Sequence, residues 1–386
     1  MHMVNYLQHL IIRYGKCIIL IFSTIFYASC SDVNKNIRTD FESLLDNKFS
    51  ENEPGGVILV KKGKDTIFLK SYGLADLSTK EKINENTIFN TGSISKTFVS
   101  NGILILEEAS LLSKDDSVDK YFNDFDNKEI AKKVNIKHLL SHTSGIPDVR
   151  KVAEENEFYL TAKDEENFEP IKHADTLNFE PGEKFEYSNP AYNGLALIIE
   201  KVSNQKWQKF IEEKIFKPAG MNYSRITDGP YPDEGVAHAY GNENENYVEY
   251  DYGEFPTFAA AGNGGIWCSI LDLAKYESAI REHTFLSKES IDTSRTIFRP
   301  ENWKDANPPV IGWSWFINEK DNSENKYGVK IIYHTGSQGG FRAFFYSVPE
   351  KDILYAGLFN RPIEEFSEIV KTGLDILKKY NWLDSL

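Results

Sequence analysis

The sequence contains little cysteine, no basic cluster and no hydrophobic run of membrane-spanning length. Only Cys17, Cys30 and Cys268 occur in 386 residues, too few to staple a scaffold with disulfides or to build a metal site from thiolates. The eight histidines include no H-E-x-x-H motif, so a helical zinc site is not predicted. We therefore expect no metal centre.

Acidic residues dominate the charge. Asp and Glu number 58 against 44 Lys and Arg, for a formal charge of −14 at pH 7. A chain of this sign without a basic block does not attract a phosphate backbone, so nucleic acid is excluded as a partner. Polyanionic substrates are disfavoured for the same reason, unless a local basic pocket overrides the overall field. The apolar share of 41% and the charged share of 26% are those of an ordinary globular protein.

Residues 1–29 have the layout of a secretory signal. Arg13 and Lys16 precede an apolar run over 17–27, and two small residues follow before Cys30. The run is shorter than the roughly 20 residues that cross a bilayer. Its end resembles a bacterial lipoprotein signal, which implies that Cys30 becomes the lipidated first residue of the mature protein; a plain signal peptide and a single anchor helix are the alternatives. We expect export to the bacterial cell envelope, with a lipid anchor in a membrane and the chain facing the periplasm or exterior.

The period of the apolar residues predicts one domain over residues 37–385. After a polar tether over 30–36, apolar spacing predicts a helix over 37–49, and a β-hairpin follows over 55–69. A closing helix is predicted over 365–380. Three consecutive strands are predicted before it, at 330–334, 341–346 and 353–358.

Strands at both ends of the chain therefore enclose a middle region of short helical pieces. Between residues 113 and 255 no strand pairing is predicted, and the acidic stretch 233–254 is interpreted as a surface loop. The economical arrangement is an α/β fold with one antiparallel sheet built from both chain ends, flanked by helices, and an inserted, mostly helical part. We expect the α/β part over about 37–95 and 305–385, and the helical part over about 96–300.

Three short motifs follow one another along the chain. Ser93-Ile94-Ser95-Lys96 opens a predicted helix, Tyr187-Ser188-Asn189 lies in a turn before a helix, and His334-Thr335-Gly336-Ser337 ends a predicted strand. Each pattern is weak alone, because Ser-x-x-Lys and Tyr-x-Asn also occur elsewhere in the chain. A literal Lys-Thr-Gly at 371–373 lies inside the predicted closing helix and is interpreted as structural.

The spacing within these motifs suits nucleophilic catalysis. A serine hydroxyl is a weak nucleophile until a base lies beside it, and residues i and i+3 share one helix face, so Lys96 can lie against Ser93. The helix N-terminus and burial both disfavour an ammonium group, so we expect Lys96 to accept a proton. Tyr187 can relay a proton to the leaving group, as one coupled unit with Lys96. The backbone N–H groups of Ser93 and Ser337 can form an oxyanion hole.

These motifs resemble those of the class C β-lactamase and DD-peptidase-like serine hydrolases, a penicillin-binding-protein-like family that includes esterases and D-aminopeptidases. Segments 136–146, 216–221 and 260–269 add to the resemblance, which covers about residues 37–380. It implies a β-lactamase/transpeptidase-like fold with the active site where the α/β and helical parts meet. It also implies an acyl-enzyme mechanism without a cofactor, with Ser93, Lys96 and Tyr187 as catalytic residues. The residues implied for substrate binding are Asn189, His334, Thr335, Gly336 and Ser337.

The sequence leaves the substrate open, and one position bears on it. Class C lactamases carry a lysine where this chain has His334, and that cation meets the substrate carboxylate; histidine there resembles the DD-peptidases and esterases. We expect a small-molecule or peptide acyl substrate, such as one from peptidoglycan, in a D-Ala-D-Ala carboxypeptidase, D-amino-acid amidase or esterase reaction. A β-lactamase proper and a catalytically silent relative that binds peptidoglycan or a partner are the alternatives.

Three further expectations concern residues near the site. Arg342 is a candidate carboxylate anchor. His142 is expected in a structural turn, and the segment 262–265 is expected to allow close backbone packing near the site.

Overall fold

The structure is a computed structural model whose described residues are 32–147, 163–226, 234–243, 246–249 and 262–384. The predicted signal over 1–29 and the predicted lipidation residue Cys30 lie outside these residues, as do parts of the acidic stretch 233–254. Within the described ranges, no helix combines the length and the apolar character that a membrane crossing requires.

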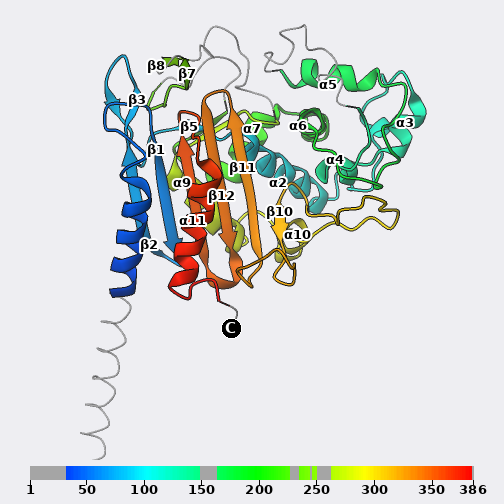
Figure 1. Ribbon diagram of the computed structural model, residues 1–386. Coiled ribbons are helices and arrows are strands. Elements are labelled where there is room, and N and C mark those ends of the chain that lie inside the picture. The colour runs from blue at the N-terminus through cyan, green and yellow to red at the C-terminus, as the bar shows by residue number, and fades with distance from the viewer. Residues whose placement is uncertain (1–31, 148–162, 227–233, 244–245, 250–261, 385–386) are drawn as a thin grey trace, which may run out of the picture.

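Six antiparallel strands from both ends of the chain form the main sheet (Figure 1). The first strand pairs with the last, with Gly56 opposite Phe359, so the sheet predicted from the alternating apolar residues is confirmed. In spatial order the strands are β10 (Phe316–Asn318), β11 (Ile331–Gln338), β12 (Phe341–Val348), β13 (Ile353–Phe359), β1 (Gly56–Lys62) and β2 (Asp65–Tyr72).

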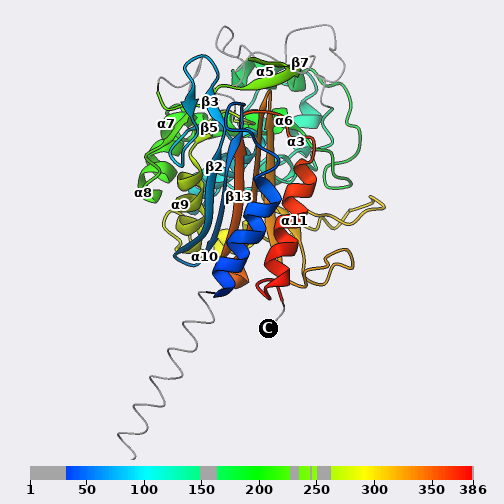
Figure 2. The ribbon, with the colours of Figure 1, turned by 60° about the vertical axis from the view of Figure 1, so that its left-hand side comes forward.

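Helices from the two chain ends cover one face of this sheet. A helix over residues 32–45 and the closing helix α11 (Phe366–Lys379) lie side by side there (Figure 2). Phe41 joins Tyr355 of β13 in one buried cluster beneath them. The first helix begins before the predicted residue 37 and takes in residues 32–36, which were predicted to be a tether. The reason is that Val33 also packs against the cluster, so the added helical turn has an apolar contact.

The opposite face of the sheet carries α9 (Ile270–Arg281) and, beyond it, the helical part of the chain. Side chains alternate along a strand, so one strand serves both faces. In β1, Val57 and Leu59 join the cluster of α9, whereas Ile58 and Val60 join the cluster of the terminal helices. The sheet is therefore buried on both sides.

The helical part consists of short helices around the longer α2 and α6, as predicted, and lies to one side of the sheet (Figure 1). Its elements are η1 (Gly92–Ile94), α2 (Ser95–Glu108), η2 (Val118–Lys120), α3 (Lys128–Lys133), α4 (Ile136–Leu140), α5 (Asp164–Lys172), α6 (Asn189–Ser203), α7 (Trp207–Ile211), the π-helical η5 (Glu212–Phe216), α8 (Lys217–Ala219) and α10 (Lys288–Ser294). A further turn, η6 (Pro349–Lys351), joins β12 to β13.

Several short strands also pair in the middle of the chain, so the prediction of no strand pairing between 113 and 255 is wrong. The acidic stretch that was interpreted as a loop contributes a hairpin of two four-residue strands, β7 and β8. Strands this short show too few alternations to be recognised locally, and only their pairing defines them. The short strands are β3 (Leu74–Asp76) with β4 (Glu81–Lys82), β5 (Phe89–Asn90) with β9 (Ile266–Cys268) and β6 (Ser224–Ile226), and β7 (Tyr240–Glu243) with β8 (Asn246–Glu249).

Candidate active site

Ser93 lies at the start of the buried helix α2. It is the middle residue of the turn η1, which runs directly into α2. Lys96, one helical turn further on, is fully buried although its side chain ends in an amine. Its Nζ donates to Ser93 Oγ at 3.2 Å and to the carbonyl oxygen of Asn263 at 2.6 Å. The spacing of the first motif thus brings serine and lysine into direct contact.

Tyr187 reaches the same point from the start of α6. Ser188 caps this helix, because its Oγ accepts the backbone N–H of Ala191 at 3.3 Å, and Asn189 is the first helical residue. The Tyr187 ring centroid lies 5.2 Å from the Nζ of Lys96. Burial raises the pKa of Tyr187 to about 12, and the nearby Ser93 side chain lowers it in part. Tyr187 is therefore a neutral phenol at pH 7.

His142 holds this tyrosine in place as well as forming a turn. Its ring stacks on that of Tyr187, with centroids 4.3 Å apart, and its Nδ1 accepts the backbone N–H of Ser188 at 3.0 Å. Its backbone is left-handed, with φ of 56°. Because Nδ1 accepts, the ring proton is at Nε2. Burial keeps the pKa of His142 well below its usual value, so the ring is neutral.

His138 and His142 stand four residues apart, a spacing at which two histidines of one helix can bind a metal ion. Here α4 ends at Leu140, before the second histidine. His138 Nδ1 instead accepts the backbone N–H of Asn135 at 3.0 Å and caps the helix. Throughout the part of the chain that the structure describes, no three His, Cys, Asp or Glu side chains are grouped so that they could hold a metal ion.

Strand β11 packs against the turn of Ser93 without intervening side chains. A Cβ on Gly336 would lie 2.0 Å from the carbonyl oxygen of Thr91, and one on Gly92 would lie 2.7 Å from the backbone nitrogen of Ser337. Gly92 also has φ of 53°, which favours glycine. The third motif, His334 to Ser337, was predicted to end the strand. It lies within β11 instead, because the strand continues to Gln338. This contact brings the backbone of Ser337 to the turn that carries Ser93.

The side chains of the third motif alternate in exposure. Thr335 and Ser337 are exposed, whereas His334 and Gly336 are buried against the helical part. His334 Nδ1 donates to the carbonyl oxygen of Thr335 at 2.7 Å. Burial, with the nearby Lys96, lowers the pKa of His334 to about 3. His334 is therefore neutral at pH 7 and also at pH 6, and it supplies no cation for a substrate carboxylate.

Three polar residues belong to this site that the sequence did not single out as functional: the buried Asp164 and Asn193, and the half-buried Asn263. Asn263 lies in the segment 262–265, which was expected only to allow close packing, yet its carbonyl oxygen accepts from Lys96. Asp164 bonds to Asn193, 29 residues away, and to Gly262, 98 residues away. No local pattern marks such residues, because their contacts exist only in the folded chain.

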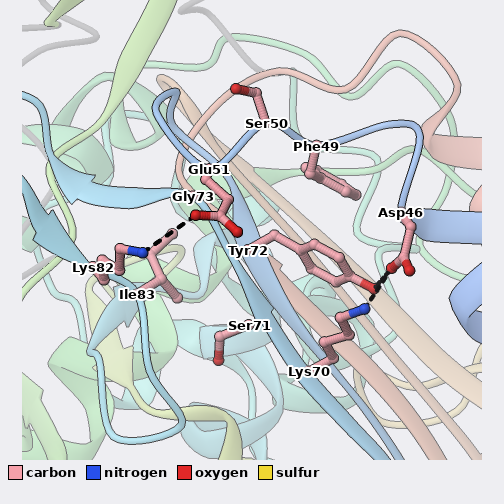
Figure 3. Close-up of a pocket in the computed structure, with 10 residues that line it drawn as sticks. All are labelled: Asp46, Phe49, Ser50, Glu51, Lys70, Ser71, Tyr72, Gly73, Lys82 and Ile83. Atoms are coloured by element: carbon pink, nitrogen blue, oxygen red, sulfur yellow. Dashed lines mark hydrogen bonds and ion pairs between the residues drawn. The ribbon is translucent and has the colours of Figure 1, made fainter.

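A cavity of about 320 Å³ lies along the edge strand β2, and Ser93 is not among its lining residues (Figure 3). The Lys70 ammonium contacts the Asp46 carboxylate at 2.6 Å, and the Tyr72 hydroxyl donates to the same carboxylate at 3.1 Å. Lys82 and Glu51 form a longer pair at 3.4 Å. The lysines and acids of this cavity are thus paired with one another.

A serine at the start of a helix, contacted by a buried lysine that has a tyrosine ring beside it, defines the chain as a serine hydrolase. The sequence model of the β-lactamase family matches residues 37–378, and the chain belongs to this family.

Similar proteins agree with this assignment. The chain is 29% identical over 359 residues to penicillin-binding protein 4* of Bacillus subtilis, covering 89% of this chain and 77% of that protein. The octameric penicillin-binding protein homologue from Pyrococcus abyssi has a TM-score of 0.73 at 30% identity, over 88% of this chain and 77% of that one. The D-amino acid amidase from Ochrobactrum anthropi SV3 shares the fold, with a TM-score of 0.72 at 20% identity over 91% and 99% of the two chains. The predicted family and fold are confirmed.

Gly336→Ala is expected to separate β11 from the turn of Ser93. The new methyl group would lie 2.0 Å from the Thr91 carbonyl oxygen, and such overpacking destabilises a core by about 1–3 kcal/mol. We expect that loss in urea unfolding, together with at least about a tenfold loss of ester hydrolysis. Gly220→Ala is the control, because its Cβ would meet nothing within 4 Å and only its φ is strained, at about 1 kcal/mol. Wild-type stability and turnover in Gly336→Ala would contradict the contact.

Burial of neutral His334 predicts that the fold loses stability in mild acid. The unfolded chain binds a proton at this histidine near its ordinary pKa of about 6.5, whereas in the folded protein burial lowers the pKa to about 3. Stability is therefore retained at pH 7 and lost as the pH falls below 6.5. Between pH 7 and pH 5 the loss from His334 is about 2 kcal/mol.

Urea unfolding at pH 7 and pH 5 measures this loss as the difference between wild type and His334→Gln. The variant is expected to lose less stability over that interval. His173→Gln, at an exposed histidine whose pKa is raised by Asp126, is not expected to reduce the loss. An equal pH dependence in wild type and His334→Gln would show that His334 is protonated in the folded protein.

Proposed function

We propose that the chain cleaves acyl substrates through an acyl-enzyme on Ser93, with Lys96 and Tyr187 as its proton-transfer unit. The observation that carries this proposal is the contact of the Lys96 Nζ with Ser93 Oγ, at 3.2 Å, beside the Tyr187 ring, whose centroid lies 5.2 Å from the same Nζ. Lys96 is fully buried beside Ser93. Burying an amine without a partner is unfavourable, so packing alone does not account for a lysine at this position. A lysine held there is suited to activate a nucleophile.

The reaction follows from these contacts. Lys96 takes the proton of Ser93 Oγ while this oxygen attacks the carbonyl carbon of the substrate. The oxyanion that forms accepts hydrogen bonds from the backbone N–H groups of Ser93 and Ser337. The bond to the leaving group breaks as the proton passes through the Tyr187 hydroxyl to the leaving nitrogen or oxygen. Water then attacks the acyl ester, which releases the acid and returns a proton to Ser93.

The substrates that we propose are a D-amino-acid amide, a short ester or a D-Ala-D-Ala peptide. Neutral His334 offers no cation to the carboxylate of a β-lactam, and Arg342 uses Nη1 to contact the carbonyl oxygens of Gly339 and Phe341, at 2.6 and 2.7 Å. The absence of a fixed cation favours a D-amino-acid amide or a short ester over a β-lactam, and also over the free carboxylate of a D-Ala-D-Ala peptide. The likeness to penicillin-binding protein 4* supports a peptide or amide substrate related to peptidoglycan, bound by Asn189, Thr335 and the strand backbone of Gly336 and Ser337.

We also propose, from the sequence alone, that the chain is exported and anchored by a lipid on Cys30. The layout of charged, apolar and small residues before Cys30 supports this location. A position at the cell envelope would give the site access to peptidoglycan fragments. The proposed reaction requires no metal or cofactor.

A substrate panel tests the proposed function. A D-Ala-D-Ala peptide, a D-amino-acid amide, a short p-nitrophenyl ester and nitrocefin are each given to wild type and Ser93→Ala. We expect Ser93-dependent turnover of at least one of the first three, with kcat/KM about tenfold or more above that for nitrocefin. Ser117→Ala is the matched control, since Ser117 opens another Ser-x-x-Lys sequence and bonds to Asp119 instead of a lysine.

Two results of the panel would overturn the proposal. Nitrocefin turnover that depends on Ser93 and far exceeds the other three reactions would make the protein a β-lactamase proper. Absence of turnover on every substrate, with the protein folded, would make it a silent relative whose site binds ligands without cleaving them.

A further inference from the structure

A buried carboxyl group near the site has no part in acyl transfer. Asp164 is the first residue of α5 and is only 4% exposed. Burial raises its pKa to about 8, although three hydrogen-bond donors act in the opposite direction. Placing an acid where its ionised form is so disfavoured reduces stability. We therefore ask which other residues the hydrogen bonds of Asp164 hold in position.

Those hydrogen bonds join three separate segments of the chain. Oδ1 of Asp164 accepts the Asn193 side-chain amide and the Gly262 backbone N–H, both at 2.7 Å. Oδ2 accepts the indole N–H of Trp207 at 2.7 Å. Helices α6 and α7 and the turn that begins at Gly262 therefore all meet at one carboxyl group. A Cβ on Gly262 would lie 2.7 Å from the carbonyl oxygen of Tyr192, so this turn is pressed directly onto α6.

The turn held in this way carries the acceptor of Lys96. Asn263, next to Gly262, donates its side-chain amide to Asn193 Oδ1 at 3.1 Å. Its backbone carbonyl oxygen accepts from Lys96 Nζ at 2.6 Å. Asn263 is thus fixed on two sides. Asp164 holds the backbone of its neighbour Gly262, and Asn193 accepts a hydrogen bond from its side chain. Lys96 Nζ in turn lies between this carbonyl and Ser93 Oγ.

We infer that Asp164 is a positioning residue for Lys96, which it orients toward Ser93 by holding the turn of Gly262 and Asn263. The inference rests on the proposed role of Lys96 as the base. Asp164 acts through its acceptor oxygen Oδ1, because the two groups that it orders, Asn193 and Gly262, both donate to that atom. An error of about 1 Å in the place of a reacting group can lower turnover about a hundredfold. The effect is expected on kcat, because Asp164 and Asn193 are buried and do not meet the substrate.

A matched pair of variants isolates the acceptor oxygen. In Asp164→Asn with Trp207→Phe, the amide oxygen can still accept from Asn193 and Gly262, while the amide nitrogen faces a ring that has no N–H. In Asp164→Ala with Trp207→Phe, the oxygen is gone. Both double variants lack the ionisable carboxyl group and the indole. We expect kcat for p-nitrophenyl ester turnover, per folded molecule, to be at least about tenfold lower in the alanine variant. KM is expected to differ by less than about threefold.

Asn193→Ala provides a second measurement if the alanine double variant does not fold. It cuts the same chain of hydrogen bonds at its next link, and we expect the same selective loss of kcat. Asp272→Asn is the control for losing a buried carboxylate. Asp272 accepts the Tyr223 backbone N–H at 2.6 Å and the Ser224 hydroxyl at 2.9 Å at the start of α9, so its loss is expected to lower stability and leave kcat unchanged.

The outcomes separate this inference from the proposed function. Equal kcat in the two Asp164 double variants, or an unchanged kcat in Asn193→Ala, would overturn the positioning role while Ser93-dependent turnover of the wild type stands. A wild type without Ser93-dependent turnover would overturn the proposed function, and the positioning role with it. A loss shared equally by KM and kcat would also contradict the inference, because it would indicate a general disturbance of the site.

Discussion

The contact between β11 and the turn of Ser93 is the constraint on which the site depends. It is a contact of backbone with backbone, which the chain achieves by placing Gly336 against Thr91 and Gly92 against Ser337. Cores behave as close-packed solids, so a single added carbon at either point has to displace main chain. This contact also joins the two parts of the molecule, since β11 belongs to the sheet and the turn leads into the helical part. Any hydrolase chemistry at Ser93 needs both parts in register.

The second feature of the site is that Lys96 and Tyr187 are held by fixed neighbours. Lys96 has acceptors in Ser93 and Asn263, and the Tyr187 ring stacks on His142. Polar groups fixed in this way do not have to reorient when charge develops in the transition state. Such preorganisation is usually the largest contribution to the rate enhancement at sites of this kind. Burial explains why His334 is neutral, and it links the electrostatics of the fold to the class of substrate proposed here.

The sequence allowed prediction of the features that have local signals. Five of the six main strands have seven residues or more, and Lys96 follows Ser93 at helical spacing, so these strands and that contact could be predicted. The sixth, β10, has only three residues and was not predicted. The four-residue strands β7 and β8 show too little alternation. The helical turn at residues 32–36 is polar and depends on the packing of Val33. Asp164 and Asn263 act through hydrogen bonds between distant segments, which no pattern along the chain encodes.

The central claim is that Ser93 is the nucleophile, and labelling with a fluorophosphonate probe tests it most directly. The probe forms a covalent bond only with an activated serine oxygen, so its position reports which hydroxyl has a base beside it. Intact mass followed by peptide mapping is expected to find one adduct per chain, on Ser93, and none in Ser93→Ala. An adduct on another serine, or labelling of Ser93→Ala at the wild-type rate, would contradict the account.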